Sequence, residues 1–189
     1  MAWGVEQSIR LITLTVFVLW EMYDSFSHDT GGHYKSAARH YQIPIYVKAR
    51  YFPFIWGFVK ACVIASSFLY MEYTVSTAHD FPYTAVFVLF FANILMAKMW
   101  MPLFFRLHWY TGALVNSILL CATAWAIFGI AISGMNLRPD LYLAPALVWL
   151  PYPLWLTFAV FLNWQWASAK YSHMRSGQPA YNYRRLMSQ

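Results

Sequence analysis

Long apolar stretches with few charges limit what this chain can fold into more than any other feature. A helix needs about 20 consecutive, mainly apolar residues to cross the hydrocarbon core of a bilayer. Five stretches meet this requirement, at about residues 9–26, 51–73, 82–105, 109–134 and 143–168. Because they occupy most of the 189 residues, we predict an all-α membrane protein in which five transmembrane helices form a single domain over residues 1–189.

The composition agrees with a protein that resides in lipid. Hydrophobic residues make up 60% of the chain and charged residues 11%, whereas soluble domains are about 25% charged. The sequence has no HExxH motif, no glycine-rich phosphate loop after a strand and no Ser/His/Asp arrangement, so we do not expect an enzyme. Cys62 and Cys121 both fall inside predicted spans, where we expect them to pack as small apolar side chains.

Lysine and arginine gather on one side of the five-span arrangement. The long loop 27–50, the turn after the third span and the basic C-terminal tail 169–189 share that side. They carry Lys35, Arg39, Lys48, Arg50, Arg106, Lys170, Arg175, Arg184 and Arg185, while the other side holds only Arg10 and Arg138. The positive-inside rule therefore places the C-terminus on the cytosol-like side of the membrane. We interpret the net charge of +6 as a topology signal that also attracts anionic headgroups, and we do not expect nucleic-acid binding.

The long loop also contains several histidines. His28, His33 and His40 occur there together with Asp29. Their spacing matches no defined metal site, so we expect solvated side chains and no metal ion. A metal ligand or an axial haem ligand is the alternative.

One stripe of the fifth predicted span combines large rings with a small residue and an amide. On a helix of 3.6 residues per turn, Trp155, Ala159, Leu162, Asn163 and Trp166 project along one side. Such a stripe can form a flat slot in which ring faces enclose a guest and the amide orients it. The alternative is a seam between helices, in which Asn163 bonds across to a neighbour. Trp164 and Trp166 would then belong to an interfacial aromatic belt.

Lys60 lies inside the second predicted span, one helical turn after Trp56. A lysine within a span costs roughly 2.5–3.5 kcal/mol on insertion scales, so we expect it to face a partner or a cavity. It could contact a carboxylate of a tetrapyrrole or a lipid, beside the ring of Trp56. The alternative is a lysine that is paired or that extends to the membrane surface, as we expect of Lys98.

Three segments carry a resemblance to a known family. The segment PYPLWLTFAVFLNWQW supplies PY, W, FA and LN at fixed spacing, through Pro151, Tyr152, Trp155, Phe158, Ala159, Leu162 and Asn163. It resembles the fifth-helix signature of the TspO/MBR family, the tryptophan-rich sensory or translocator proteins. The segment WMPLFFRL, which begins at Trp100, is similar to the family's W-x-x-LFF segment, and PFIWGF resembles its second-helix motif through Trp56 and Gly57. The resemblance covers residues 9–168.

The resemblance implies a five-helix bundle with a pocket between helices that opens toward the loop after the first helix. Members of the family bind porphyrins, haem, sterols and aromatic ligands, and eukaryotic members are mostly mitochondrial. The resemblance implies no cofactor with certainty, although a porphyrin, a haem or a lipid would suit the pocket. The candidate pocket residues are Trp56, Lys60, Trp100, Tyr152, Trp155, Ala159, Leu162 and Asn163.

The sequence and the resemblance together suggest two candidate functions. The chain departs from the family at Ala97, where the family has Asn, and at Lys60, where it has Tyr. Because these positions are altered, and because Lys60 and Lys98 require partners, we expect an accessory or structural subunit of a larger membrane complex with a degenerate pocket. We expect this complex to be a respiratory complex of a mitochondrial membrane. The partners of the chain would then be membrane lipids and other membrane-protein subunits. The alternative is a stand-alone binder, transporter or sensor of porphyrin, haem or other flat hydrophobic ligands.

Overall fold

The computed structural model describes Ile12, Val16 and residues 31–75, 83–135 and 139–177. All regular structure within these residues is helical, with no strand among them, which confirms the all-α class. In chain order the elements are α2 (Gly31–His40), η1 (Ala49–Tyr51), α3 (Phe52–Val75), α4 (Tyr83–Met101), η2 (Pro102–Arg106), α5 (Tyr110–Met135), α6 (Pro139–Trp149) and α7 (Pro151–Arg175).

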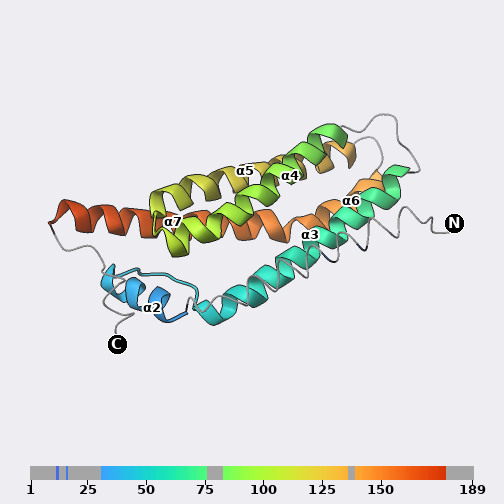
Figure 1. Cartoon of the computed structure of the whole chain (residues 1–189). Coiled ribbons are helices and arrows are strands. Elements are labelled where there is room, and N and C mark those ends of the chain that lie inside the picture. The colour runs from blue at the N-terminus through green and yellow to red at the C-terminus, as the bar shows by residue number, and fades with distance from the viewer. Residues whose placement is uncertain (1–11, 13–15, 17–30, 76–82, 136–138, 178–189) are drawn as a thin grey trace.

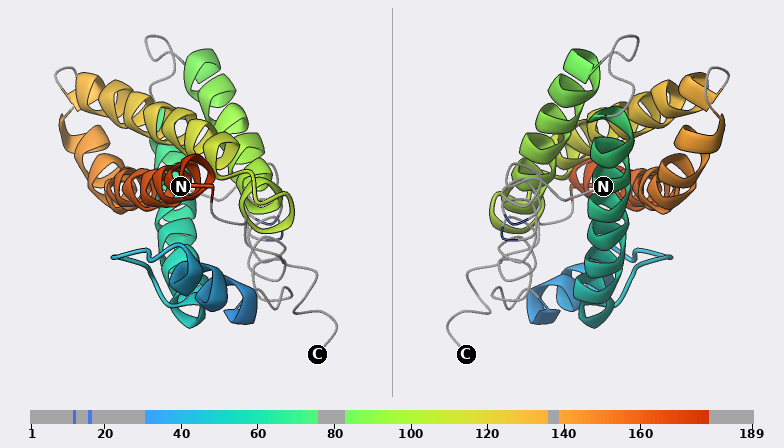
Figure 2. Two further views of the ribbon diagram at one scale, coloured as in Figure 1. Left: turned by 90° about the vertical axis from the view of Figure 1, so that its left-hand side faces the viewer. Right: turned by 90° about the vertical axis from the view of Figure 1, so that its right-hand side faces the viewer.

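The long helices lie side by side in an elongated bundle (Figure 1). Helix α5 packs against α4, α6 and α7, while α3 packs against α6 and α7. The short helix α2 lies beside the start of α3, as the end-on views also show (Figure 2). The end of the bundle that holds α2 also holds the start of α5 and the ends of α4 and α7, because buried residues of these segments form one cluster.

Three helical segments are long and apolar enough to cross a membrane: Val88–Arg106, Tyr110–Gly134 and Leu143–Arg175. A fourth apolar segment, Phe54–Ser67, is shorter. The predicted span 9–26 lies outside the described residues, apart from Ile12 and Val16. The structure thus supports a membrane protein with several helical crossings, and a total of five stays a prediction.

The fifth predicted span is divided between two helices and is longer than its apolar stretch. The chain passes from α6 to α7 at Leu150, and Pro151 and Pro153 occupy the first turn of α7, where a missing backbone N–H is tolerated. The segment Leu143–Arg175 has 33 residues, or roughly 50 Å at 1.5 Å per residue, more than the thickness of a hydrocarbon core. Its C-terminal turns therefore extend into the predicted tail 169–189, and the helix ends before Gly177, which has a φ of 68°.

The predicted loop 27–50 contains a helix, so that prediction is corrected over Gly31–His40. The buried residues are Tyr34, Ala37, Ala38 and Tyr41, which follow the i, i+3, i+4, i+7 pattern of a helix with one buried face. The polar residues between them made the segment resemble a loop. Packing of this face against the bundle accounts for a helix that is shorter than isolated helices need to be.

A buried hydrogen-bond network joins α4, α5 and α7 in the middle of the bundle. The Tyr152 hydroxyl donates to Oδ1 of Asn93 at 2.6 Å. Nδ2 of Asn93 donates to the Leu120 carbonyl at 3.0 Å and to the Thr123 hydroxyl at 2.8 Å. The amide thus fixes the relative positions of three helices.

Tyr152→Phe should destabilise the bundle, because it leaves Oδ1 of Asn93 without the hydroxyl donor. We expect the free energy of unfolding to fall by about 1 kcal/mol, in the range measured for hydrogen bonds between membrane helices. Unfolding in mixed micelles measures this change. Tyr171→Phe, which alters an exposed tyrosine, is the control and should leave stability unchanged. Equal stability of the two variants would contradict a role for the network.

Candidate functional site

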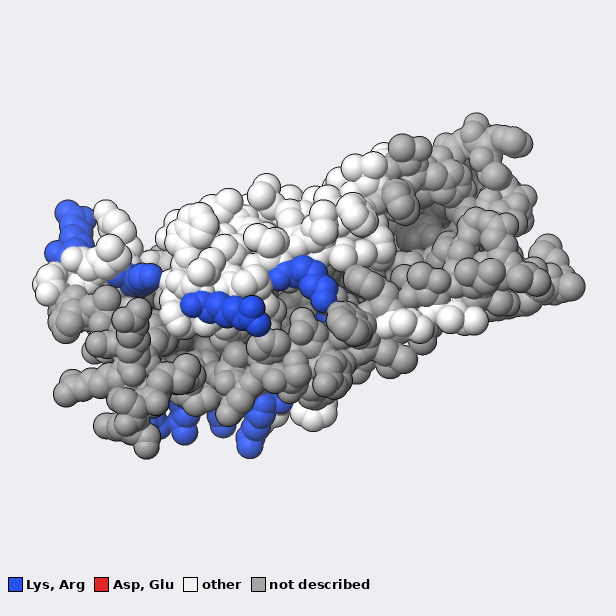
Figure 3. Space-filling model, viewed as in Figure 1, with Lys and Arg blue, Asp and Glu red and all other residues white. Residues whose placement is uncertain are grey.

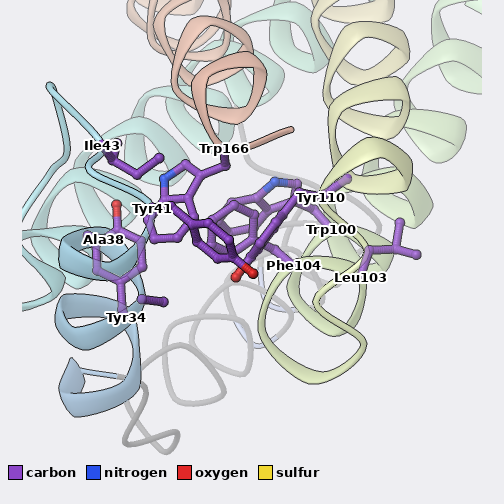
Figure 4. Packing of buried hydrophobic residues seen from close by; sticks show 11 residues of the cluster. Tyr34, Ala38, Tyr41, Ile43, Trp100, Leu103, Phe104, Tyr110 and Trp166 are labelled. Atoms are coloured by element: carbon purple, nitrogen blue, oxygen red, sulfur yellow. The ribbon is translucent and has the colours of Figure 1, made fainter. Parts of the chain in front are cut away.

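Aromatic rings from α2, α4, η2, α5 and α7 meet at the end of the bundle that holds α2. Figure 4 shows Tyr34 and Tyr41 from α2 and its C-terminal end directed toward Trp166 of α7 and the rings of α4 and η2. Tyr34 stacks on Trp166 with ring centroids 5.1 Å apart, and Trp100 stacks on Phe104 at 5.2 Å. All of these side chains are buried, so α2 forms a cap over this end, which we call the α2 cap.

The WMPLFFRL segment reaches the cluster through a change of helix type. After Met101 the chain continues as the π-helix η2, in which the Leu107 N–H donates to the Pro102 carbonyl at 2.9 Å. Single-turn π-helices often occur at functional sites. Here the wider turn places Phe104 against Trp166, with ring centroids 5.4 Å apart.

A small cavity lies between the α2 cap and the bundle. Its volume is about 20 Å³, close to the space that one water molecule needs. Its lining residues are Tyr34, Phe52, Trp56, Trp100, Phe104, Trp155, Ala159, Leu162, Asn163 and Trp166. The cavity is small because the rings that line it pack against one another.

Six of the eight candidate pocket residues line this cavity: Trp56, Trp100, Trp155, Ala159, Leu162 and Asn163. The other two lie elsewhere. Tyr152 belongs to the Asn93 network, and Lys60 is half-buried on α3 without lining the cavity.

Four lining residues were absent from the eight candidate pocket residues: Tyr34, Phe52, Phe104 and Trp166. Trp166 lies on the stripe of span five and Phe104 in the LFF segment, so both carried a usable signal. Tyr34 could have been found from its helical spacing with Ala37, Ala38 and Tyr41.

The amide of Asn163 is already bonded in this arrangement. Its Oδ1 accepts from Nε1 of Trp100 at 3.0 Å, and its Nδ2 donates to the Ala159 carbonyl at 2.7 Å. Asn163 therefore joins α7 to α4, as the seam interpretation predicts, although the same stripe also lines a cavity. Of the two tryptophans assigned to a membrane belt, Trp164 is 54% exposed and Trp166 only 1%.

Trp155 contributes a polar atom that the described residues do not satisfy. Its Nε1 is buried and has no hydrogen-bond acceptor among them. The ring meets Trp56 edge to face, with centroids 6.3 Å apart. A buried donor without an acceptor costs about 1–3 kcal/mol, so an acceptor atom placed beside Trp155 would be stabilised.

Polar contacts hold the segment after α2 and the turn before α5 against α7. The Ile45 N–H donates to Oε1 of Gln165, and Nε2 of Gln165 donates to the Ile45 carbonyl, both at 3.3 Å. Nζ of Lys170 donates to the His108 carbonyl at 2.8 Å and lies 5.3 Å from the ring centre of Tyr110. In the cap itself, burial raises the pKa of the Tyr34 hydroxyl, so this group is neutral at physiological pH.

The histidines do not form a multi-ligand metal site within the described residues. His40 and His173 lie 5.1 Å apart between ring centroids. No group of three or more His, Cys, Asp or Glu side chains in the described part of the chain could hold a metal ion. His28 and Asp29 of the long loop lie outside that part.

Asn163→Leu should weaken the contact between α4 and α7, because the Trp100 N–H loses its acceptor in a buried position. We expect the free energy of unfolding to fall by about 1 kcal/mol, measured by unfolding in mixed micelles. Ser172→Ala, which removes an exposed hydroxyl, serves as the control and should have no effect. An Asn163→Leu protein as stable as the original would contradict the importance of this bond.

Comparison with known proteins gives one family match. The profile described as the TspO/MBR family matches residues 11–168. Searches of curated proteins and of solved structures return no match.

Proposed function

The chain belongs to the TspO/MBR family, and from this premise we propose that it binds flat hydrophobic ligands between its helices. Porphyrin and haem are the representative ligands. The family match and the apolar helices support a multi-pass integral membrane protein. The binding proposal assigns no reaction to the chain.

The observation that carries this proposal is the convergence of six candidate residues on one cavity wall. Trp56, Trp100 and Trp155 come from α3, α4 and α7, so three indole rings reach the same space from different helices. Ala159 leaves room between them because its side chain is a single methyl group. Ligand sites typically combine apolar and aromatic walls with a few polar groups, and Trp155 offers such a group through its buried N–H.

The size of the cavity requires a structural change on binding. A volume of about 20 Å³ is far below the roughly 300–1,000 Å³ of typical small-molecule pockets. A porphyrin would need the rings of the α2 cap to move away from the bundle. Tyr34 is the ring that the cap contributes to the wall, so outward movement of α2 would enlarge the cavity without separating the transmembrane helices.

Binding can be tested with protoporphyrin, which should quench tryptophan fluorescence by occupying the enlarged cavity. Ala159→Phe should weaken this binding at least tenfold, because the added ring fills the space that the ligand needs. Ala126→Phe adds the same ring at an exposed position of α5 and should bind as the original protein does. Fluorescence titration in detergent or nanodiscs measures both variants.

The proposal fails if the folded original protein shows no saturable quenching. It also fails if Ala159→Phe and Ala126→Phe bind protoporphyrin equally well, because binding would then occur outside the cavity.

The attachment of Ile45 to Gln165 provides a kinetic prediction. Gln165→Leu removes both hydrogen bonds that hold Ile45. Because Ile45 is 49% exposed, water can satisfy its backbone once the attachment is lost. We expect protoporphyrin to associate several-fold faster with this variant in stopped-flow quenching, with Ser172→Ala as the unchanged control. An association rate equal to that of the original protein would contradict opening at the cap.

A second candidate function is that of an accessory subunit in a larger, mitochondrial respiratory membrane complex, with the C-terminus on the cytosol-like side. The small volume of the cavity favours a degenerate pocket, as do the departures from the family pattern at Lys60 and Ala97. Extraction of native membranes in mild detergent tests this role. Co-migration with a large complex would support it, and migration only as a monomer or small oligomer would exclude it.

A further inference from the structure

We propose that the outer face of the α2 cap is a docking surface for anionic phospholipid headgroups, and that these headgroups hold the cap against the bundle. The proposal concerns charge on the outside of the protein. It does not depend on ligand binding in the cavity.

The end of the bundle that carries the cap is uniformly basic among the described residues. Segments 31–51, 102–110 and 163–177 contain no Asp or Glu. Their cations are Lys35, Arg39, Lys48, Arg50, Arg106, Lys170 and Arg175, all exposed except the half-buried Lys170. Figure 3 shows Lys and Arg side chains toward this end, with no acidic atoms among the described residues on the face in view.

The α2 helix separates its charges from its buried side chains. Lys35 and Arg39, one turn apart, are exposed, whereas Tyr34, Ala38 and Tyr41 are buried against the bundle. The buried face places Tyr34 in the cavity wall, and the opposite face presents two cations. An anion that binds Lys35 and Arg39 would therefore act on α2, the helix that closes the cavity.

Exposed aromatic side chains occur at the same end of the bundle. Trp109, Trp164 and Tyr171 are all more than half exposed, and Tyr51 is 45% exposed. Trp and Tyr are enriched at the interface between lipid and water. These rings would place the cations of the cap at the depth of the headgroups, where anionic lipids attract juxtamembrane Lys and Arg.

Repulsion between cations determines whether anionic lipid stabilises or destabilises the closed position of α2. Lys35 and Arg39 carry like charges one turn apart on α2 and repel each other. Anionic headgroups would place negative charge beside Lys35 and Arg39 in the closed arrangement. A ligand that binds the folded arrangement preferentially stabilises it, so anionic lipid should keep α2 closed more of the time.

Hydrogen exchange in nanodiscs tests the proposal without any cavity ligand. The full-length protein is compared in pure phosphatidylcholine and in phosphatidylcholine mixed with phosphatidylserine. We expect the amides of α2 to exchange about tenfold more slowly in the anionic discs. Anionic headgroups attract nearby Lys and Arg side chains, and this attraction should hold α2 in its closed position. High salt should remove most of the difference, since it screens exposed charges.

A matched pair of variants identifies the docking face. The double variant Lys35→Gln with Arg39→Gln should lose most of the lipid response, whereas Lys35→Arg with Arg39→Lys keeps both charges and should retain it. Equal exchange of α2 in the two lipid mixtures would overturn the proposal. So would a full response in the glutamine variant, or the same protection from a soluble polyphosphate in neutral discs, because the source would then not be a lipid surface.

Discussion

A hydrocarbon core offers no hydrogen-bond partner, and the described interior of this protein is organised by that constraint. Buried amides on neighbouring helices bond across the bundle: Asn93 to the Leu120 carbonyl, Asn116 to the Met96 carbonyl at 2.8 Å, and Asn163 to the indole of Trp100. Ser66 of α3 similarly donates to the Pro145 carbonyl of α6 at 2.8 Å. Each of these four polar side chains therefore fixes one helix against another. Trp155 and Trp166 depart from this pattern because the buried indole N–H of each has no acceptor among the described residues, and both line the candidate cavity.

The same constraint separates two parts of the bundle. The middle is held by directional bonds around Asn93. At the end near α2, the bonds of Asn163 and Gln165 are joined by many contacts between aromatic rings, such as Tyr34 on Trp166. Ring contacts are less directional than a bonded amide, and a short helix covers them from outside. The proposed binding of flat ligands would use this division, with the middle of the bundle fixed and α2 moving outward. The proposed docking of anionic headgroups on the outer face of α2 would link this movement to the membrane surface.

The sequence predicts most of the helical layout, because apolar length and hydrophobic patterning depend on local composition. It also predicts six cavity residues through motifs on three helices. It does not predict α2, since the helix is stabilised by tertiary packing of Tyr34, Ala37 and Ala38 rather than by its own composition. The role of Tyr152 is missed for a similar reason: its partner, Asn93, lies 59 positions away in the chain. Ala97 stands where the family has an asparagine, and the structure places a bonded amide one turn earlier, at Asn93.

The central claim is that α2 packs on the ends of α4 and α7 and that Tyr34 closes the cavity there. Photo-crosslinking tests it directly, with benzoylphenylalanine introduced at position 34 of the full-length protein in lipid nanodiscs. Mass spectrometry of the irradiated protein should locate crosslinks in the segment around Trp100 to Phe105 or in the segment around Asn163 to Lys170. Crosslinks only to lipid, or to helical segments at the opposite end of the bundle, would contradict this account.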